Sequence, residues 1–165
     1  MLVIFGGLPG TGKSTLALKL AGQVGAVYLR IDTIERAIVA GEQAVPLWEE
    51  GYRVAYAVAD DNLRLGHTVI ADSVNPLQIT RSAWRGVAER VGAKAVEIEV
   101  VCSDQAEHRH RIETRAVEVP VSWDEVVTRH FEAWTTEHIR IDTAGQSIEQ
   151  SFAALRQMLP TQLRS

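Results

Sequence analysis

Several features that would settle the class of a protein at once are missing from this sequence. Its only cysteine is Cys102, so the chain cannot form an internal disulfide, which fits a reducing compartment. No apolar run approaches the ~20 residues that a membrane-spanning helix needs. The N-terminus also lacks the basic segment and the cleavage site of a secretory signal. From these absences we expect a cytoplasmic protein that does not enter a membrane.

An excess of positive charge is missing as well. Lysine and arginine total 17 against 21 aspartate and glutamate residues, and the formal net charge is −4. This balance provides no general attraction to nucleic acid, and no tract combines basic with aromatic residues. The length of 165 residues suits one domain with a full hydrophobic core and excludes a second domain of similar size. We therefore predict a single domain over residues 1–165 and disfavour nucleic acid as a partner.

Short apolar runs alternate along the chain with longer amphipathic stretches, which is the pattern of parallel strands joined by helices. The apolar runs predict strands at residues 2–5, 26–31, 68–71, 95–101 and 138–141. The amphipathic stretches predict helices at residues 13–24, 48–65, 79–91, 105–116, 123–134 and 147–159. The sequence therefore predicts an α/β fold built on a parallel sheet.

A glycine-rich stretch directly after the first predicted strand matches the P-loop pattern G-x-x-x-x-G-K-[S/T]. Glycines let backbone N–H groups point inward around an anion, and the next helix adds the positive end of its dipole. In this pattern Lys13 neutralises the β- and γ-phosphates, which makes it catalytic, and the Ser14 hydroxyl coordinates Mg²⁺. The chain has no Asn-Lys-x-Asp guanine motif, so ATP and Mg²⁺ are the predicted cofactors. The predicted nucleotide-binding residues are Gly7, Leu8, Pro9, Gly10, Thr11, Gly12, Lys13, Ser14 and Thr15.

Two aspartates follow predicted strands at the sheet edge where ligands bind in open parallel folds. Asp32, after the second strand, is the candidate general base that accepts the proton of an attacking hydroxyl. Its alternative role is to cap a helix that begins at Thr33. Asp72, after the third strand, is a candidate Mg²⁺ ligand or acceptor contact, and Ser73 adds a hydrogen-bonding group.

A very polar helix is predicted after the fourth strand, at residues 105–116. On such a helix Arg111 and Arg115 share one face, where their guanidinium groups can hold phosphate oxygens and stack on adenine. The charge pattern alone favours a solvated helix with a Glu107–Arg111 pair. The P-loop reverses that preference, and we predict that both arginines contact the nucleotide.

Four segments together resemble the small P-loop kinases of the nucleoside-monophosphate-kinase-like group. They are the P-loop, the pattern Arg-x-Asp-x-x-x-Arg at residues 30–36, VIADSVNPLQITRSAW at residues 69–84 and HRHRIETR at residues 108–115. Within that group the chain is most similar to zeta toxin, chloramphenicol phosphotransferase and polynucleotide 5′-kinase, over nearly its whole length. The resemblance implies a P-loop NTPase three-layer α/β/α sandwich, with a five-stranded parallel sheet in the order 2-3-1-4-5. It also implies an acceptor-binding segment at about residues 33–66 and a helical lid at about residues 105–122.

The resemblance implies roles for particular residues as well. In such kinases the aspartate after the second strand activates the acceptor hydroxyl and a nearby arginine holds the acceptor, which correspond to Asp32 and Arg36. Lid arginines contact the base and the transferred phosphate, which supports Arg111 and Arg115 as nucleotide-binding and catalytic residues. The turn after the last strand often lies against the adenine, which makes Thr143 a candidate contact.

The sequence thus predicts an ATP-dependent kinase that transfers the γ-phosphate to a hydroxyl of a small-molecule acceptor. A polynucleotide 5′-hydroxyl kinase is the alternative suggested by residues 69–84, and the acidic net charge argues against it. An ATP-dependent switch or binding module without an acceptor is the alternative from another class. The likeness to zeta toxin leaves a protein or nucleotide-sugar acceptor open. Aromatic residues at 48–56 would suit a flat acceptor, although such spacing is more typical of a core; they are Trp48, Tyr52 and Tyr56, with Arg53 among them.

Overall fold

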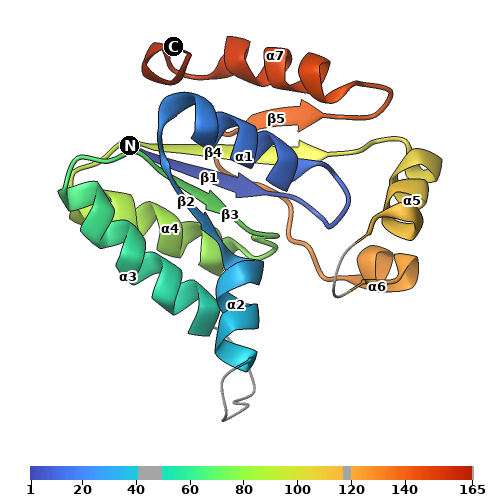
Figure 1. Ribbon diagram of the computed structural model, residues 1–165, viewed down its shortest axis with the longest axis horizontal. Helices are drawn as coiled ribbons and strands as arrows, with labels where there is room; N and C mark the ends of the chain where they lie inside the picture. The colour runs from blue at the N-terminus through green and yellow to red at the C-terminus, as the bar shows by residue number, and fades with distance from the viewer. Residues whose placement is uncertain (41–49, 117–119, 165) are drawn as a thin grey trace.

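The computed structural model describes residues 1–40, 50–116 and 120–164 (Figure 1). The strands are β1 (Leu2–Gly6), β2 (Val27–Arg30), β3 (Val69–Asp72), β4 (Ala95–Val101) and β5 (Ile139–Asp142). The helices are α1 (Lys13–Val24), α2 (Ile31–Val39), α3 (Glu50–Arg64), α4 (Gln78–Arg90), α5 (Gln105–Thr114), α6 (Trp123–Thr128) and α7 (Ile148–Met158), followed by a short 3₁₀ helix at Thr161–Leu163. The strands form one parallel sheet in the order β2-β3-β1-β4-β5. The predicted fold class and strand order are therefore confirmed.

Strand β1 lies at the centre of the sheet, and both of its faces are covered. Val3 and Phe5 pack with α1 and α7 on one face, whereas Leu2 and Ile4 pack with α3 and α4 on the other. Figure 1 shows the two helix layers on opposite sides of the sheet. A strand that is buried on both faces must be apolar at every position, which explains the unbroken apolar run. The result is the predicted three-layer sandwich.

The parallel strands bring all their carboxyl ends to one edge of the sheet. Helix α2 follows β2 without a loop, and α5 and α6 also lie beyond this edge (Figure 1). None of the helices in the described part of the chain is long and apolar enough to cross a membrane. The edge therefore collects the turns and helices from which a ligand site can be built.

Helix α6 is shorter than the sequence predicts. It ends at Thr128 rather than continuing over residues 123–134. Beyond it the backbone N–H of Glu132 donates to the carbonyl oxygen of Pro76 at 2.9 Å, and Arg81 Nη2 donates to the carbonyl oxygen of Glu132 at 2.6 Å. These partners outside the helix replace the hydrogen bonds that a longer α6 would make, so the predicted bound is wrong.

Arg81 on α4 holds this segment in place. Its side chain is fully buried, and its guanidinium carbon lies 5.1 Å from the ring centroid of Phe131 and 4.3 Å from that of Trp134. It also donates to the carbonyl oxygens of Asn75 and Pro76, each at 3.0 Å. One arginine thus joins the loop after β3 to the segment that leads into β5.

Candidate active site

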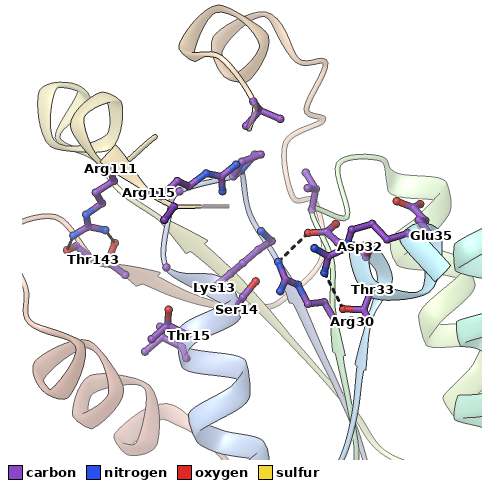
Figure 2. Close-up of a pocket in the computed structure, with 18 of the residues that line it drawn as sticks. Lys13, Ser14, Thr15, Arg30, Asp32, Thr33, Glu35, Arg111, Arg115 and Thr143 are labelled. Carbon is purple, nitrogen blue, oxygen red and sulfur yellow. Dashed lines mark hydrogen bonds and ion pairs between the residues drawn. The ribbon is translucent and has the colours of Figure 1, made fainter. Parts of the chain in front are cut away.

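A cavity of about 1520 Å³ lies at the carboxyl edge of the sheet. The P-loop with the start of α1, helix α2, the end of α5 and the turn after β5 all contribute to its lining. Figure 2 shows Thr143 at one side of the cavity, Lys13 in the middle and Asp32 at the other side. A ligand can therefore extend from the turn after β5, past the P-loop, to α2.

The P-loop between β1 and α1 depends on its glycines. Gly7, Gly10 and Gly12 have φ angles of 144°, 84° and 90°, which side-chain-bearing residues rarely adopt. A Cβ atom on Gly10 would also lie 2.6 Å from Cδ1 of Ile112 on α5. Because Gly12 is the N-cap of α1 and has no side chain, no side chain caps the helix there. The loop is shaped to receive an anion on backbone N–H groups.

Lys13 is the first residue of α1 and is only 7% exposed. Among the described residues it makes no hydrogen bond or ion pair. Burial lowers the pKa of its ammonium group, and the negative charges of Asp72 and Asp32 oppose this shift. A buried, unpartnered cation is costly unless a ligand compensates its charge. The environment of Lys13 therefore fits an anionic ligand.

Asp72 lies at the end of β3 and is 1% exposed. Its Oδ2 accepts a hydrogen bond from the Tyr28 hydroxyl at 2.6 Å and lies 3.9 Å from Arg30 Nε. Its Oδ1 is buried and has no hydrogen-bond partner among the described residues. Burial and the Asp72 charge raise the pKa of Tyr28, so its hydroxyl stays a donor. Ser73 is also buried, and neither it nor Asp72 lines the cavity.

In the described part of the chain, no three His, Cys, Asp or Glu side chains are close enough together to hold a metal ion by themselves.

His108, on α5, is buried, and its Nε2 lies 2.7 Å from the carbonyl oxygen of Pro9. This histidine joins α5 to the P-loop.

Helix α2 carries the predicted acceptor residues into the cavity. It begins at Ile31, so Asp32 lies in its first turn and does not cap a helix beginning at Thr33; that alternative is wrong. The Asp32 carboxylate is half exposed, and its Oδ2 lies 3.3 Å from Arg30 Nη2. Arg36 donates from Nε to the backbone oxygen of Asp32 at 3.1 Å. Asp32 and Arg36 both line the cavity, as Lys13 does.

Arg111 is turned toward the end of β5 (Figure 2). Its Nη1 donates to Thr143 Oγ1 at 2.8 Å and its Nη2 to the Thr143 carbonyl oxygen at 2.9 Å. The same Nη2 donates to Glu107 Oε1 at 2.5 Å, so the Glu107–Arg111 pair of the alternative interpretation is also present. Thr143 Oγ1 in turn donates to the carbonyl oxygen of Thr11 at 2.9 Å. Arg111 thereby connects α5, the turn after β5 and the P-loop.

Arg115 points instead toward the middle of the cavity (Figure 2). Helix α5 ends at Thr114, and Arg115 is already extended, with φ −70° and ψ 133°. The two arginines therefore do not share a helix face as predicted, because one of them lies outside the helix. Arg115 Nε is buried without a hydrogen-bond partner among the described residues. Burial lowers the pKa of Arg115; the charge of Asp32 opposes the shift and that of Arg30 adds to it.

Three charged residues that the sequence analysis did not select line the cavity together with Asp32. Arg30 is the first residue of the Arg-x-Asp-x-x-x-Arg pattern, and Glu35 lies three residues after Asp32 on α2, so each offered a signal. Arg129 follows α6, where the sequence predicted a longer helix, so no sequence signal indicated that it lines the cavity. Burial and the charge of Asp32 raise the pKa of Glu35, whereas Arg129 opposes this shift. Asp32 and Arg129 thus both act on Glu35, and Arg30 pairs with Asp32.

The aromatic residues of α3 lie in the core rather than at the cavity. The Tyr56 ring packs edge-on against Trp84, with centroids 4.6 Å apart. The Tyr52 hydroxyl accepts a hydrogen bond from the Asn75 N–H at 3.3 Å. Trp48 lies outside the described residues. Of the described residues in segment 33–66, only those at 33–40 line the cavity.

Comparison with known proteins adds a family and a set of structural neighbours. The family model described as AAA domain matches residues 2–140. No curated protein matches the chain. Among solved structures, a candidate kinase from Chloroflexus aurantiacus is similar at 19% identity and a TM-score of 0.72, covering 96% of this chain and 98% of its own.

Two further solved structures are similar over most of their length. A gluconokinase from Sinorhizobium meliloti has 16% identity and a TM-score of 0.65, covering 94% of this chain and 91% of its own. The Mycobacterium tuberculosis APS kinase CysC, in complex with AMPPNP and APS, has 23% identity and a TM-score of 0.68, with 93% and 94% covered. The chain thus shares the fold of small P-loop kinases, as its sequence resemblance implied.

Proposed function

The chain belongs to the AAA domain family, and from that premise we propose that it is an ATP-dependent kinase that phosphorylates a hydroxyl of a small-molecule acceptor. The observation that carries the proposal is that Lys13 and Asp32 line one cavity and influence each other electrostatically. A phosphate-binding lysine facing an accessible carboxylate is the arrangement that phosphoryl transfer to a hydroxyl requires. The APS kinase of the same fold, solved with AMPPNP and APS, supports this choice.

The nucleotide extends from Thr143 to the P-loop in this proposal. The phosphates bind the backbone N–H groups of the P-loop, with Lys13 beside the β- and γ-phosphates. Arg111 is engaged at Thr143, so it belongs to the side of the cavity that receives the adenine. Arg115 points to the centre with a free, buried Nε, so it is the arginine assigned to the transferred phosphate. The two lid arginines thereby receive different roles.

Ser14 and Asp72 fit a magnesium ion. Asp72 has one buried carboxylate oxygen with no hydrogen-bond partner among the described residues, and such an atom is costly unless a ligand satisfies it. Ser14 lines the cavity in the first turn of α1. Carboxylate and hydroxyl oxygens are the hard donors that magnesium prefers. When bound, the ion would neutralise charge on the phosphates.

Asp32 is the general base of the proposed reaction. The acceptor oxygen forms a bond to the γ-phosphorus while the bond between that phosphorus and the β–γ bridging oxygen breaks. The hydroxyl proton passes to Asp32, and ADP leaves. Lys13 and Arg115 stabilise the negative charge that develops on the phosphate oxygens. Arg30 Nη2 lies 3.3 Å from Asp32 Oδ2 and holds the carboxylate in position beside the cavity.

The test is phosphate transfer from γ-labelled ATP with Mg²⁺ to a panel of polyols, hydroxy acids, sugar phosphates, nucleosides and 5′-hydroxyl oligonucleotides. Asp32→Asn is expected to reduce transfer about 10²- to 10⁴-fold, the range of general base catalysis, without weakening AMPPNP binding. Asp61→Asn, an exposed aspartate on α3, is the matched control and is expected to retain wild-type transfer.

The outcomes separate the candidate functions. Labelling of a small hydroxyl compound that Asp32→Asn abolishes supports the kinase. Labelling of oligonucleotides alone would replace the small-molecule acceptor with a nucleic acid. If no compound is labelled and Asp32→Asn hydrolyses ATP at the wild-type rate, the general base assignment fails and an ATP-dependent switch becomes the better explanation.

A further inference from the structure

Among the residues that the structure describes, the acceptor side of the cavity contains more positive than negative side chains. Arg30, Arg36 and Arg129 line it from the end of β2, from α2 and from the residue after α6. Two carboxylates of the described residues, Asp32 and Glu35, line the same region. Arginine stays charged at any physiological pH, so protein groups cannot remove this excess by losing protons.

Neither carboxylate is positioned to cancel the excess. Asp32 contacts Arg30 and is reserved for the hydroxyl proton in the proposed reaction. Glu35 makes no ion pair with any residue that the structure describes, and burial and the Asp32 charge raise its pKa. Arg129 makes no hydrogen bond or ion pair with any residue that the structure describes. The guanidinium of Arg129 is therefore available to a ligand.

Among these arginines, Arg30 lies on the side of Lys13 away from Thr143, although its charge also acts on Lys13. Figure 2 shows Lys13 and Ser14 between Thr143 on one side and Arg30 with Asp32 and Glu35 on the other. ATP that lies along the P-loop has Lys13 and Arg115 at its terminal phosphates. Its charge is thus compensated without Arg129, whose own charge acts on Glu35.

We propose that the acceptor carries an anionic group, a carboxylate or a phosphate, which Arg129 and Arg30 bind while its hydroxyl faces Asp32. This inference rests on the proposed kinase function and specifies its substrate class. Guanidinium groups hold carboxylates and phosphates through paired N–H donors, which fixes orientation as well as charge. Val39, Val74 and Val121 line the same cavity and provide apolar contacts for the carbon skeleton of the acceptor.

The inference is tested by binding rather than by turnover. The protein is first saturated with AMPPNP and Mg²⁺, so that the phosphate-binding groups are occupied. D-glycerate, sn-glycerol 3-phosphate and glycerol are then titrated at low ionic strength, with ¹⁵N chemical shifts as the readout. We expect one of the anions to bind at least tenfold more tightly than glycerol. The preferred anion distinguishes a carboxylate from a phosphate.

Variants identify the residues that hold the anion. Arg129→Gln and Arg30→Gln are each expected to weaken anion binding about tenfold, which corresponds to the loss of one charge-assisted contact. Arg129 is exposed at the end of α6, so its substitution leaves the fold intact. Arg140→Gln on β5, whose side chain is 63% exposed and pairs with Glu99, is the control and should bind as wild type does.

Three results would overturn the inference: glycerol binding as tightly as the anions, no saturable binding of either anion, or anion binding that both arginine variants retain. Each would leave the kinase proposal standing, provided AMPPNP binds and transfer depends on Asp32. If AMPPNP does not bind, the proposed function fails at its nucleotide step, and that failure is visible before any anion is added.

Discussion

The two halves of the cavity are built from different parts of the chain. On the nucleotide side, backbone groups of the P-loop form the surface, and Arg111 is already tied to Thr143 by two hydrogen bonds. On the acceptor side, the surface consists of long charged side chains, and Asp32 is half exposed. A backbone site recognises any phosphate in the same way, whereas a side-chain site changes with single substitutions. In the proposed function, the nucleotide half therefore suits a ligand common to many proteins, and the acceptor half determines the substrate.

The largest effect is expected from the nucleotide half. Lys13→Met should reduce phosphate transfer about 10³-fold, because it removes the cation beside the transferred group. The melting temperature should stay equal or rise, since Lys13 is a buried charge without a partner in the described residues. Initial rates and thermal unfolding measure the two effects, with the exposed Lys94→Met as the control. A variant that unfolds more readily than wild type would contradict this account of Lys13.

Arg81→Met tests whether the acceptor half depends on a buried residue of α4 that does not itself line the cavity. The variant removes the Arg81 donor from the carbonyl oxygens of Asn75, Glu132 and Ala133, so we expect the free energy of unfolding to fall by about 3 kcal/mol. Arg129 lies in the segment that Arg81 fixes, so anion binding should weaken while AMPPNP binding stays near wild type. Urea unfolding and titration of each ligand test the claim, and equal losses for both ligands would argue against it.

Substitutions of Arg111 and Arg115 are expected to separate ATP binding from phosphate transfer. Arg115→Gln should lower kcat about 10²-fold with little change in the KM for ATP, because it acts on the transferred phosphate. Arg111→Gln should instead raise the KM for ATP, because it disconnects the lid helix from Thr143. Steady-state kinetics at saturating acceptor distinguish the two. The reverse pattern would exchange the roles assigned to the arginines.

The nucleotide half was predictable from the sequence because its geometry is local. The P-loop needs glycines at fixed positions between a strand and a helix, and Gly7, Gly10 and Gly12 adopt the positive φ angles that this requires. Strand order was also accessible, since the resemblance to P-loop kinases extends over nearly the whole chain. Lys13 and Ser14 followed from the same pattern.

The acceptor half was less predictable because long-range contacts define it. Arg129 lies beyond the end of α6 at Thr128, in a segment that is held by Arg81 through Glu132, 51 positions away in sequence. Helical periodicity contains no information about such a contact. The prediction that Arg111 and Arg115 share a helix face was wrong for a similar reason, because it assumed that the helix continues beyond Thr114.

The smallest effect is expected at Glu35, where stability and specificity oppose each other. Its folded-state pKa lies above the ordinary value of 4.5 because of burial and the charge of Asp32. A carboxyl group with a raised pKa stabilises the fold when protonated, and this contribution is lost as the pH rises from that ordinary value through the folded-state pKa. Glu35→Gln should therefore match wild-type stability near pH 4 and exceed it at pH 7, by a few tenths of a kcal/mol for this partly exposed group.

The same substitution removes a negative charge beside Arg129, so anionic compounds should bind the AMPPNP complex a few-fold more tightly. Thermal unfolding between pH 4 and 7 measures the first effect, and the anion titration measures the second. Glu89→Gln, an exposed glutamate on α4, serves as the control for both. Tighter anion binding without a pH-dependent gain in stability would mean that Glu35 affects ligand binding but not the stability of the fold. A gain in stability with weaker anion binding would mean that Glu35 itself contacts the acceptor, and the charge argument for an anionic substrate would then lose its main support.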